Sequence, residues 1–433
     1  MGNIHPKSYY YPKAENQIMY NARVPQFFLV FIMMILGMDA CSPNSSQPAR
    51  KWYRGNLHTH SFWSDGNDYP EVITAWYKQH GYHFLAISDH NTLQEGQKWV
   101  TVDSTDYDHY LRYVRLFGDQ WVEVIPLADS LSDGDADLWR VRLKTMSEYR
   151  SLFEESGKFL LIKSEEISDR FEKKPLHVNA TNIQTLLLPQ RGADVVEVLQ
   201  NNVDAILDQR TTTGKPILPH INHPNFGYAI SPDELAAVNG DNFFEVYNGH
   251  PLVHNAGDST HASTDATWDY VLTKRLLEDG ALFYGLAVDD AHHYSKFNVT
   301  RANPGRGWVM VHATELTPAA IISALESGDF YASTGVVLDS IWHTGKKYGL
   351  AIQPRPGVQY TTQFIVTLAD HPEEPGIVRA TSTGLAVEYN IRGDELYVRA
   401  KVESSRLKEN PGTPGELEQA WVQPVKVNHP TAK

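Results

Sequence analysis

Cysteine is almost absent from this sequence: among 433 residues, only Cys41 is a cysteine. An intramolecular disulfide is therefore impossible, and so is a zinc site built from paired thiolates. Any metal ion that this chain binds must be held by histidine nitrogens and carboxylate oxygens. Histidine, in contrast, fills 19 positions, so one isolated H-x-H pair such as His58 and His60 means little without further ligands.

Positive charge is also scarce: the sequence has 38 basic and 52 acidic residues, and its formal net charge is -14. A protein that binds the backbone of a nucleic-acid polymer needs a basic face, so we expect no such partner. A small phosphorylated substrate is compatible with this charge if metal ions hold its phosphate. The hydrophobic share of 42% is that of a soluble globular protein, and the length allows a large core.

The N-terminal part lacks an apolar run long enough to cross a bilayer comfortably. Residues 27–38, FFLVFIMMILGM, form a run of 12, the length of the hydrophobic region of a signal peptide. Arg23 precedes the run, and Cys41 follows it, ahead of a polar Pro- and Ser-rich linker at 42–51. This order resembles a bacterial lipoprotein signal, with Met19 as an alternative start.

We therefore predict a signal segment at 1–41, a lipid anchor at Cys41 and a location at the membrane, facing the periplasm or the cell exterior. A plain membrane anchor, or an uncleaved signal with an unrelated cysteine, is the alternative.

From Trp52 onward, short apolar runs alternate with segments of helical pattern. We predict buried parallel strands at 84–88, 159–162, 216–218, 243–247, 282–288 and 308–311. Helices are predicted from Pro70 to Gly81, after a capping box at Ser231 and Glu234, and after Thr317. Repeated strand–helix units predict an α/β fold for residues 52–338.

The pattern changes after Leu338. Segments 360–368, 385–391 and 395–404 alternate apolar and polar residues, as half-buried strands do. We predict a small all-β domain, with a tail, at 339–433. Within the first domain, the long segment between 91 and 163 includes a predicted helix over the barrel rim at about 140–157.

Residues that can bind metal ions gather where the predicted strands end. His58 and His60 extend a strand, and a period of two points both rings to the same side. The other strands lead into Asp89 and His90, Glu165 and Glu166, His220 and His223, and Asp289 to His293. In α/β barrels the active site lies at the carboxyl ends of the strands. Five such ends predict a metal site there.

The motifs HTH with SDG, ISDHN, SEEIS with HVN, NHPN and DDAH occur in this order over about residues 54–336. Together they resemble the PHP family (polymerase and histidinol phosphatase domain). The resemblance implies a distorted (β/α)7 barrel that holds two or three divalent ions, Zn, Mn or Fe, and acts as a phosphoesterase. Ser164 and Asp289 depart from the family pattern, which usually has Gly and Ser there.

The resemblance also implies nine metal ligands: His58, His60, Asp65, His90, Glu166, His177, His223, Asp290 and His292. In the family's arrangement one metal ion takes His58, His60, Glu166 and Asp290. Glu166 bridges to a second ion with His177 and His223, and Asp65, His90 and His292 hold a third. Glu166, Asp290 and His292 are the residues to which this resemblance assigns catalysis. The family's glutamate precedes an Ile, here Ile167, which selects Glu166 over Glu165.

The predicted function is hydrolysis of a small phosphoester, a nucleotide or sugar phosphate, by a metal-activated hydroxide. A hydrolase of C–N or C–O bonds and a non-catalytic surface binding lipoprotein remain as alternatives. Asp89 and Asp289 adjoin ligands and are expected to orient them. The sequence identifies neither the substrate nor any protein partner.

Overall fold

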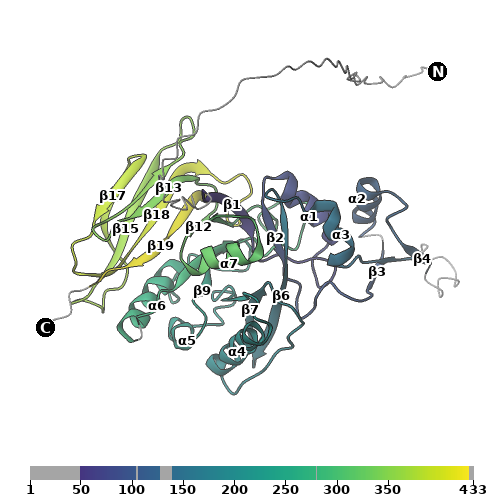
Figure 1. Ribbon diagram of the computed structural model, residues 1–433, viewed down its shortest axis with the longest axis horizontal. Coiled ribbons are helices and arrows are strands. Elements are labelled where there is room, and N and C mark those ends of the chain that lie inside the picture. Colours follow the sequence, from purple (N-terminus) through teal and green to yellow (C-terminus); the bar gives the residue numbers. More distant parts are fainter. Residues whose placement is uncertain (1–48, 104–105, 127–138, 279, 429–433) are drawn as a thin grey trace, which may run out of the picture. The chain divides into compact units, whose positions relative to one another are not determined.

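The computed structural model of the chain describes residues 49–103, 106–126, 139–278 and 280–428 (Figure 1). The predicted signal segment and Cys41 lie outside the described residues. No helix in the described ranges is both long enough and apolar enough to span a membrane.

Seven strands form a barrel around the region of the predicted metal ligands. In spatial order they are β10 (Tyr284–Val288), β9 (Phe243–Asn248), β8 (Leu218–Ile221), β7 (Lys174–Thr181), β6 (Leu160–Phe171), β2 (Phe84–Ile87) and β1 (Lys51–Asn56). The barrel closes where the chain beyond β1 meets the chain beyond β10, at a parallel bridge between Thr59 and Ala291. The predicted fold class, an α/β barrel followed by antiparallel β-structure, is confirmed.

One strand of the barrel runs against the others. β1, β2 and β6 pair in parallel, as do β8, β9 and β10, but β7 is antiparallel to both of its neighbours, β6 and β8. The sequence prediction missed β7, although Leu176, Val178 and Ala180 alternate with polar residues. The barrel is distorted because of this reversal.

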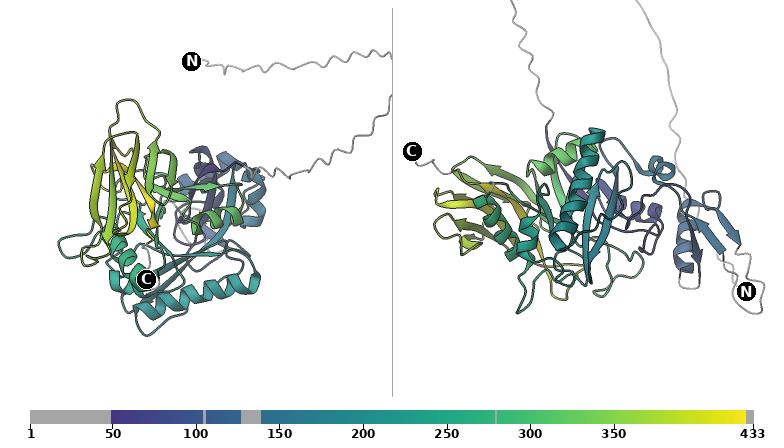
Figure 2. Two further views of the ribbon diagram at one scale, coloured as in Figure 1. Left: turned by 60° about the vertical axis from the view of Figure 1, so that its left-hand side comes forward. Right: turned by 90° about the horizontal axis from the view of Figure 1, so that it is seen from below.

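Helices cover the outside of the barrel. They are α1 (Pro70–Gln79), α3 (Met146–Phe153), α4 (Val195–Thr213), α5 (Pro232–Ala237), α6 (Thr264–Glu278) and α7 (Pro318–Glu326), while α2 (Tyr107–Phe117) packs against α1. The predicted helix starts are confirmed, because Ser231 and Glu234 form a capping box and the Thr317 side chain caps α7. The long helix α4 packs against β6, β7 and β8 (Figure 2).

The large sheet continues past the barrel into the C-terminal part of the chain. After β1 it adds β11 (Trp308–Ala313), β12 (Phe330–Ser333), β19 (Leu417–Lys426), β18 (Glu395–Leu407), β15 (Tyr360–Leu368) and β16 (Ile377–Ser382). A second sheet contains β13 (Leu338–His343), β14 (Lys347–Ile352) and β17 (Ala386–Asn390). Because β12 pairs with β19, the sheet runs across the predicted boundary, and the separate domain at 339–433 stays a prediction.

Three local predictions were wrong. The strand at 308–311 is antiparallel to both β1 and β12, because it returns from the barrel to the C-terminal sheet. The strand predicted at 159–162 continues to Phe171, because the polar residues that follow the apolar run also pair with β7. The helix predicted at 140–157 is only α3, preceded by β5 (Trp139–Arg142), which forms a small sheet with β3 (Trp99–Val102) and β4 (Val124–Pro126).

Candidate metal centre

Backbone hydrogen bonds between two neighbouring strand ends hold the first ligand-bearing segments in place. Asp290 N donates to His58 O at 3.0 Å, and His60 N donates to Ala291 O at 2.9 Å. The two histidines therefore keep the alternation of a strand beyond the end of β1, with both rings buried inside the barrel. Asp290 has a positive φ of 48°, so a tight turn follows β10.

The nitrogens and oxygens of His58, His60 and Asp290 have the spacing of ligands around one ion. His58 Nε2 lies 3.1 Å from His60 Nε2, and Asp290 Oδ1 lies 3.4 Å and 3.2 Å from these two atoms. Two nitrogens bound tetrahedrally to one zinc ion are about 3.3 Å apart. These three atoms therefore fit a divalent metal ion.

Glu166 joins this group to a second one. Its Oε1 lies 3.3 Å from His58 Nε2, 2.9 Å from His177 Nδ1 and 3.5 Å from His223 Nε2. Its Oε2 lies 2.6 Å from His90 Nδ1 but outside hydrogen-bonding geometry, and has no hydrogen-bond partner among the described residues. A buried carboxylate oxygen without a donor fits a metal ligand.

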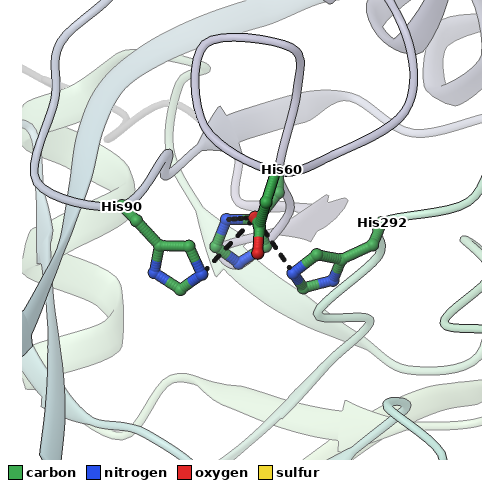
Figure 3. Close-up of side chains that lie close together, drawn as sticks. His60, His90 and His292 are labelled. Carbon is green, nitrogen blue, oxygen red and sulfur yellow. Dashed lines mark ion pairs between the residues drawn. The ribbon is translucent and has the colours of Figure 1, made fainter.

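A third group lies at the edge of the site. Asp65 Oδ1 is 3.4 Å from His292 Nε2, 3.5 Å from His90 Nε2 and 3.9 Å from His60 Nδ1. Figure 3 shows the rings of His60, His90 and His292 converging, with ion-pair lines between them and a carboxylate. The Asp65 side chain is 60% exposed, so this group faces the solvent.

The structure thus brings together all nine predicted ligands, with two differences in their grouping. His60 lies beside Asp65, His90 and His292 as well as beside His58 and Asp290. His90 also groups with Glu166 and His177, whereas the family arrangement places it with the third ion alone. The buried clusters are able to hold several metal ions.

Three buried carboxylates in this site, Glu166, Glu245 and Asp290, have no Lys or Arg partner among the residues that the structure describes. Buried carboxylates need a compensating positive charge. Without a metal ion only the histidines supply it: burial lowers the pKa of His90, but Glu166 and Asp65 outweigh burial and raise it to about 11. For His60, burial and neighbouring histidines lower the pKa to about 3. Bound cations would balance the same carboxylates.

Glu245 is a site residue that the sequence prediction missed. His58 Nδ1 donates to Glu245 Oε1 at 2.6 Å, which leaves the Nε2 lone pair of His58 for a metal ion. Glu245 Oε2 accepts hydrogen bonds from His223 N and from Asn248 Nδ2, both at 2.8 Å. A charged residue inside the apolar run FFEVY was the signal that could have revealed it.

The neighbouring glutamates of β6 point to different sides. Glu166 lies among the histidines, whereas Glu165 Oε2 accepts from Leu187 N at 3.1 Å, outside the site. Burial raises the pKa of Glu165 to about 8. The structure places the two side chains as the family register of the sequence implies.

Asp89 and Asp289 fix loops and make no hydrogen bond to a ligand side chain among the described residues. Asp89 accepts from Ser61 N and from the Ser61 hydroxyl, both at 2.7 Å, which shapes the loop that carries Asp65. Asp289 accepts from Tyr77 Oη at 2.7 Å and from Arg306 N at 2.6 Å. Both carboxylates thus hold loops next to the predicted ligands, and their orienting role stays a prediction.

No protein-family model and no curated protein matches the chain. Among solved structures, a two-domain protein from Bacteroides vulgatus, described as containing a "predicted PHP-like metal-dependent phosphoesterase", aligns at 14% identity over 86% of this chain and 95% of that chain, with a TM-score of 0.38. PsfC from Pseudomonas syringae aligns at 16% identity over 64% and 88%, with a TM-score of 0.31.

An amidohydrolase from Chromobacterium violaceum, with bound sulfate and no metal, aligns at 12% identity over 56% of this chain and 88% of that chain, with a TM-score of 0.24. TM-scores this low carry no conclusion about the chain, so its function has to be inferred from the site itself.

Proposed function

We propose that this protein is a metal-dependent hydrolase, and specifically a phosphoesterase that acts on a small phosphoester such as a nucleotide or sugar phosphate. The observation that carries the proposal is the spacing of 3.1–3.4 Å among His58 Nε2, His60 Nε2 and Asp290 Oδ1, with Glu166 shared between this group and the next. Structural metal sites are usually closed by four ligands of one ion. Shared ligands and a solvent-facing group favour catalysis instead.

Divalent ions bound in such a site would lower the pKa of a water molecule and neutralise charge on phosphoryl oxygens. The chain's own residues would hold and orient these ions. Glu245 directs the Nε2 lone pair of His58 into the site, and Asn222 Nδ2 donates to Glu166 Oε1 at 2.7 Å, which fixes that carboxylate. Solvent-facing Asp65 marks the side from which a phosphate can approach.

The test uses purified protein covering residues 50–433. We expect more than one equivalent of Zn, Mn or Fe, and hydrolysis of a phosphomonoester or phosphodiester that chelation stops and added metal restores. The same screen includes amides and carboxylic esters, so activity on those alone would contradict the phosphoesterase part of the proposal. Protein that binds no metal, or activity indifferent to chelators, would contradict the hydrolase as a whole.

We also propose that the chain is a lipoprotein anchored at Cys41, which faces the periplasm or the cell exterior. The support is the order of Arg23, the apolar run 27–38 and the sole cysteine. In a bacterial host, Cys41→Ser should abolish fatty-acid labelling and move the protein out of the membrane fraction. A Cys41→Ser protein that matures and fractionates like the wild type would overturn this assignment.

A further inference from the structure

The connection between β18 and β19 reaches from the C-terminal sheet to the end of β9 and to the loop that follows His292. Lys408 Nζ donates to Tyr247 Oη on β9 at 2.5 Å. Asn410 Nδ2 donates at 2.9 Å to the carbonyl of Pro304, in the loop that follows His292. A Cβ added at Gly412 would lie 3.5 Å from Tyr247 Oη, so this connection packs closely against the end of β9.

Lys408 is buried, with only 2% of its side chain exposed, and its charge is matched locally. Its Nζ also donates to Glu416 Oε1 at 3.0 Å, and Glu416 Oε2 accepts from Gly412 N at 2.8 Å. Burial lowers the pKa of Lys408 to about 8, although Glu416 opposes the shift. Burial of a lysine charge costs free energy. We therefore expect Lys408 to have a role other than packing.

Tyr247 is linked to the predicted ligands through the backbone of β9 and the side chain of the residue that follows it. The next residue, Asn248, donates from Nδ2 to Glu245 Oε2 at 2.8 Å and to Asp290 Oδ2 at 3.1 Å. Gly249 N donates to Val288 O at 3.0 Å, which ties the end of β9 to the end of β10. Arg306, fully buried, donates to Gly249 O at 2.7 Å from the other side.

We propose that residues 408–416 form a clamp on the metal centre, in which Lys408 is a positioning residue. Lys408 holds Tyr247, and thereby keeps Asn248 at hydrogen-bonding distance from both Glu245 and Asp290. The role of the C-terminal sheet at this point is to set the orientation of two carboxylates that the chain itself leaves without a cation. The inference rests on the proposed metal centre but on no particular substrate.

The chain offers a matched control. Lys401, on β18, also reaches from the C-terminal sheet to the barrel, where its Nζ donates to Asp265 Oδ2 on α6 at 2.6 Å. Among the described residues, Asp265 makes no hydrogen bond or ion pair to a predicted metal ligand. Lys401→Met therefore removes an ion pair between the C-terminal sheet and the barrel but leaves the hydrogen bonds of Lys408 in place, whereas Lys408→Met removes those bonds.

The experiment compares wild type, K408M, K408R, Y247F and K401M, each as purified protein covering residues 50–433. Each is loaded with Co²⁺, and metal affinity is measured by chelator competition, with the visible spectrum as a report on ligand geometry. We expect K408M to lose about 10-fold in affinity, the lower end of the range for groups that bond a ligand directly, because Lys408 acts on the ligands through Tyr247 and Asn248. Its spectrum should change, and K408R should restore part of the loss.

Y247F removes only the hydroxyl that accepts from Lys408, so it tests the clamp even if K408M does not fold. We expect a loss in affinity in the same direction, while K401M keeps the wild-type affinity and spectrum. Wild-type affinity in Y247F, or an equal loss in K401M, would overturn the clamp while leaving the proposed function intact. Wild-type protein that binds no Co²⁺ would overturn both, and the wild-type titration alone distinguishes that result.

Discussion

Two buried polar clusters in this molecule differ in how the negative charge of their carboxylates is balanced. Where α6 packs against β18, Asp269 accepts from Arg399 Nε and Nη2 at 2.6 Å each and from Tyr397 Oη at 2.7 Å. In the barrel, Glu166 lies among five histidines and keeps one oxygen without a donor. The first cluster contains its own cation, whereas the second provides only ligands, which is why we place metal ions there.

The largest difference should come from removing the shared ligand. Glu166→Gln keeps the shape but removes a negative charge that would offset two cations, so metal affinity should fall by more than the roughly 10–100-fold typical of an outer partner, and turnover should be lost. Glu165→Gln, one residue away and outside the site, is the matched control and should change little. Metal content and hydrolysis rate are compared in both; a crippled Glu165→Gln with normal Glu166→Gln would reverse our assignment.

Replacing Asp269, the acceptor in the cluster with Arg399, should change the free energy of unfolding and leave metal affinity unchanged. Asp269→Asn removes the carboxylate that accepts from Arg399 Nε and Nη2 and leaves Asp265, 3.3 Å from Nη1, as the remaining acidic partner. The free energy of unfolding should therefore fall by about 3 kcal/mol, the lower end of the range for breaking a buried pair. Metal affinity of the folded protein should stay at the wild-type value. Urea unfolding and metal titration measure the two quantities, and a parallel loss of metal affinity would mean that the clusters are not independent.

Glu71 is a third kind of buried carboxylate, because among the described residues it has neither an arginine partner like Asp269 nor a place in the predicted metal centre like Glu166. Tyr113 Oη and Trp121 Nε1 donate to its Oε1, yet burial outweighs them and raises its pKa to about 7. Since the native state then binds the proton more tightly than the unfolded state, stability present at low pH is lost as the pH rises from about 4.5 to 7.

Replacement of Glu71 by Gln should remove this dependence. Between pH 4.5 and 8, wild type should lose up to about 3 kcal/mol relative to Glu71→Gln, at about 1.4 kcal/mol for each pKa unit. Urea unfolding of both proteins at each pH gives the difference. Parallel stability profiles for the two proteins would show that Glu71 is not the titrating group.

The smallest change in free energy is expected for replacing Glu245, the carboxylate that accepts from His58. Glu245→Gln can still accept one hydrogen bond from Nδ1 but no longer carries a charge, so His58 becomes a weaker ligand. A 10–100-fold lower metal affinity, about 1.4–2.7 kcal/mol, is typical of such a change. Metal titration at constant pH measures it; an unchanged affinity would leave Glu245 as a purely structural residue of the barrel.

Local patterns in the sequence predicted much of this molecule. Helix starts at Ser231 and Thr317 follow from side chains that bond the first free backbone N–H groups, and such bonds depend only on residues three positions apart. The candidate ligands His58, His60 and Asp290 were visible because they lie at predicted strand ends, which meet at one side of a barrel, and because their motifs resemble the PHP family. The alternation of strands and helices likewise predicted the fold class.

The tertiary structure alone decided which of these groups meet. His58 and Glu245 are 187 residues apart, and Lys408 and Tyr247 are 161 apart, so no local pattern could pair them. The reversal of β7 was equally hidden, because an alternating strand looks the same whichever way it runs beside its neighbours. Within β6, where apolar residues occur on both faces, only the closed barrel determines that Glu166 points inward and Glu165 outward, since the direction of a side chain depends on what packs against each face.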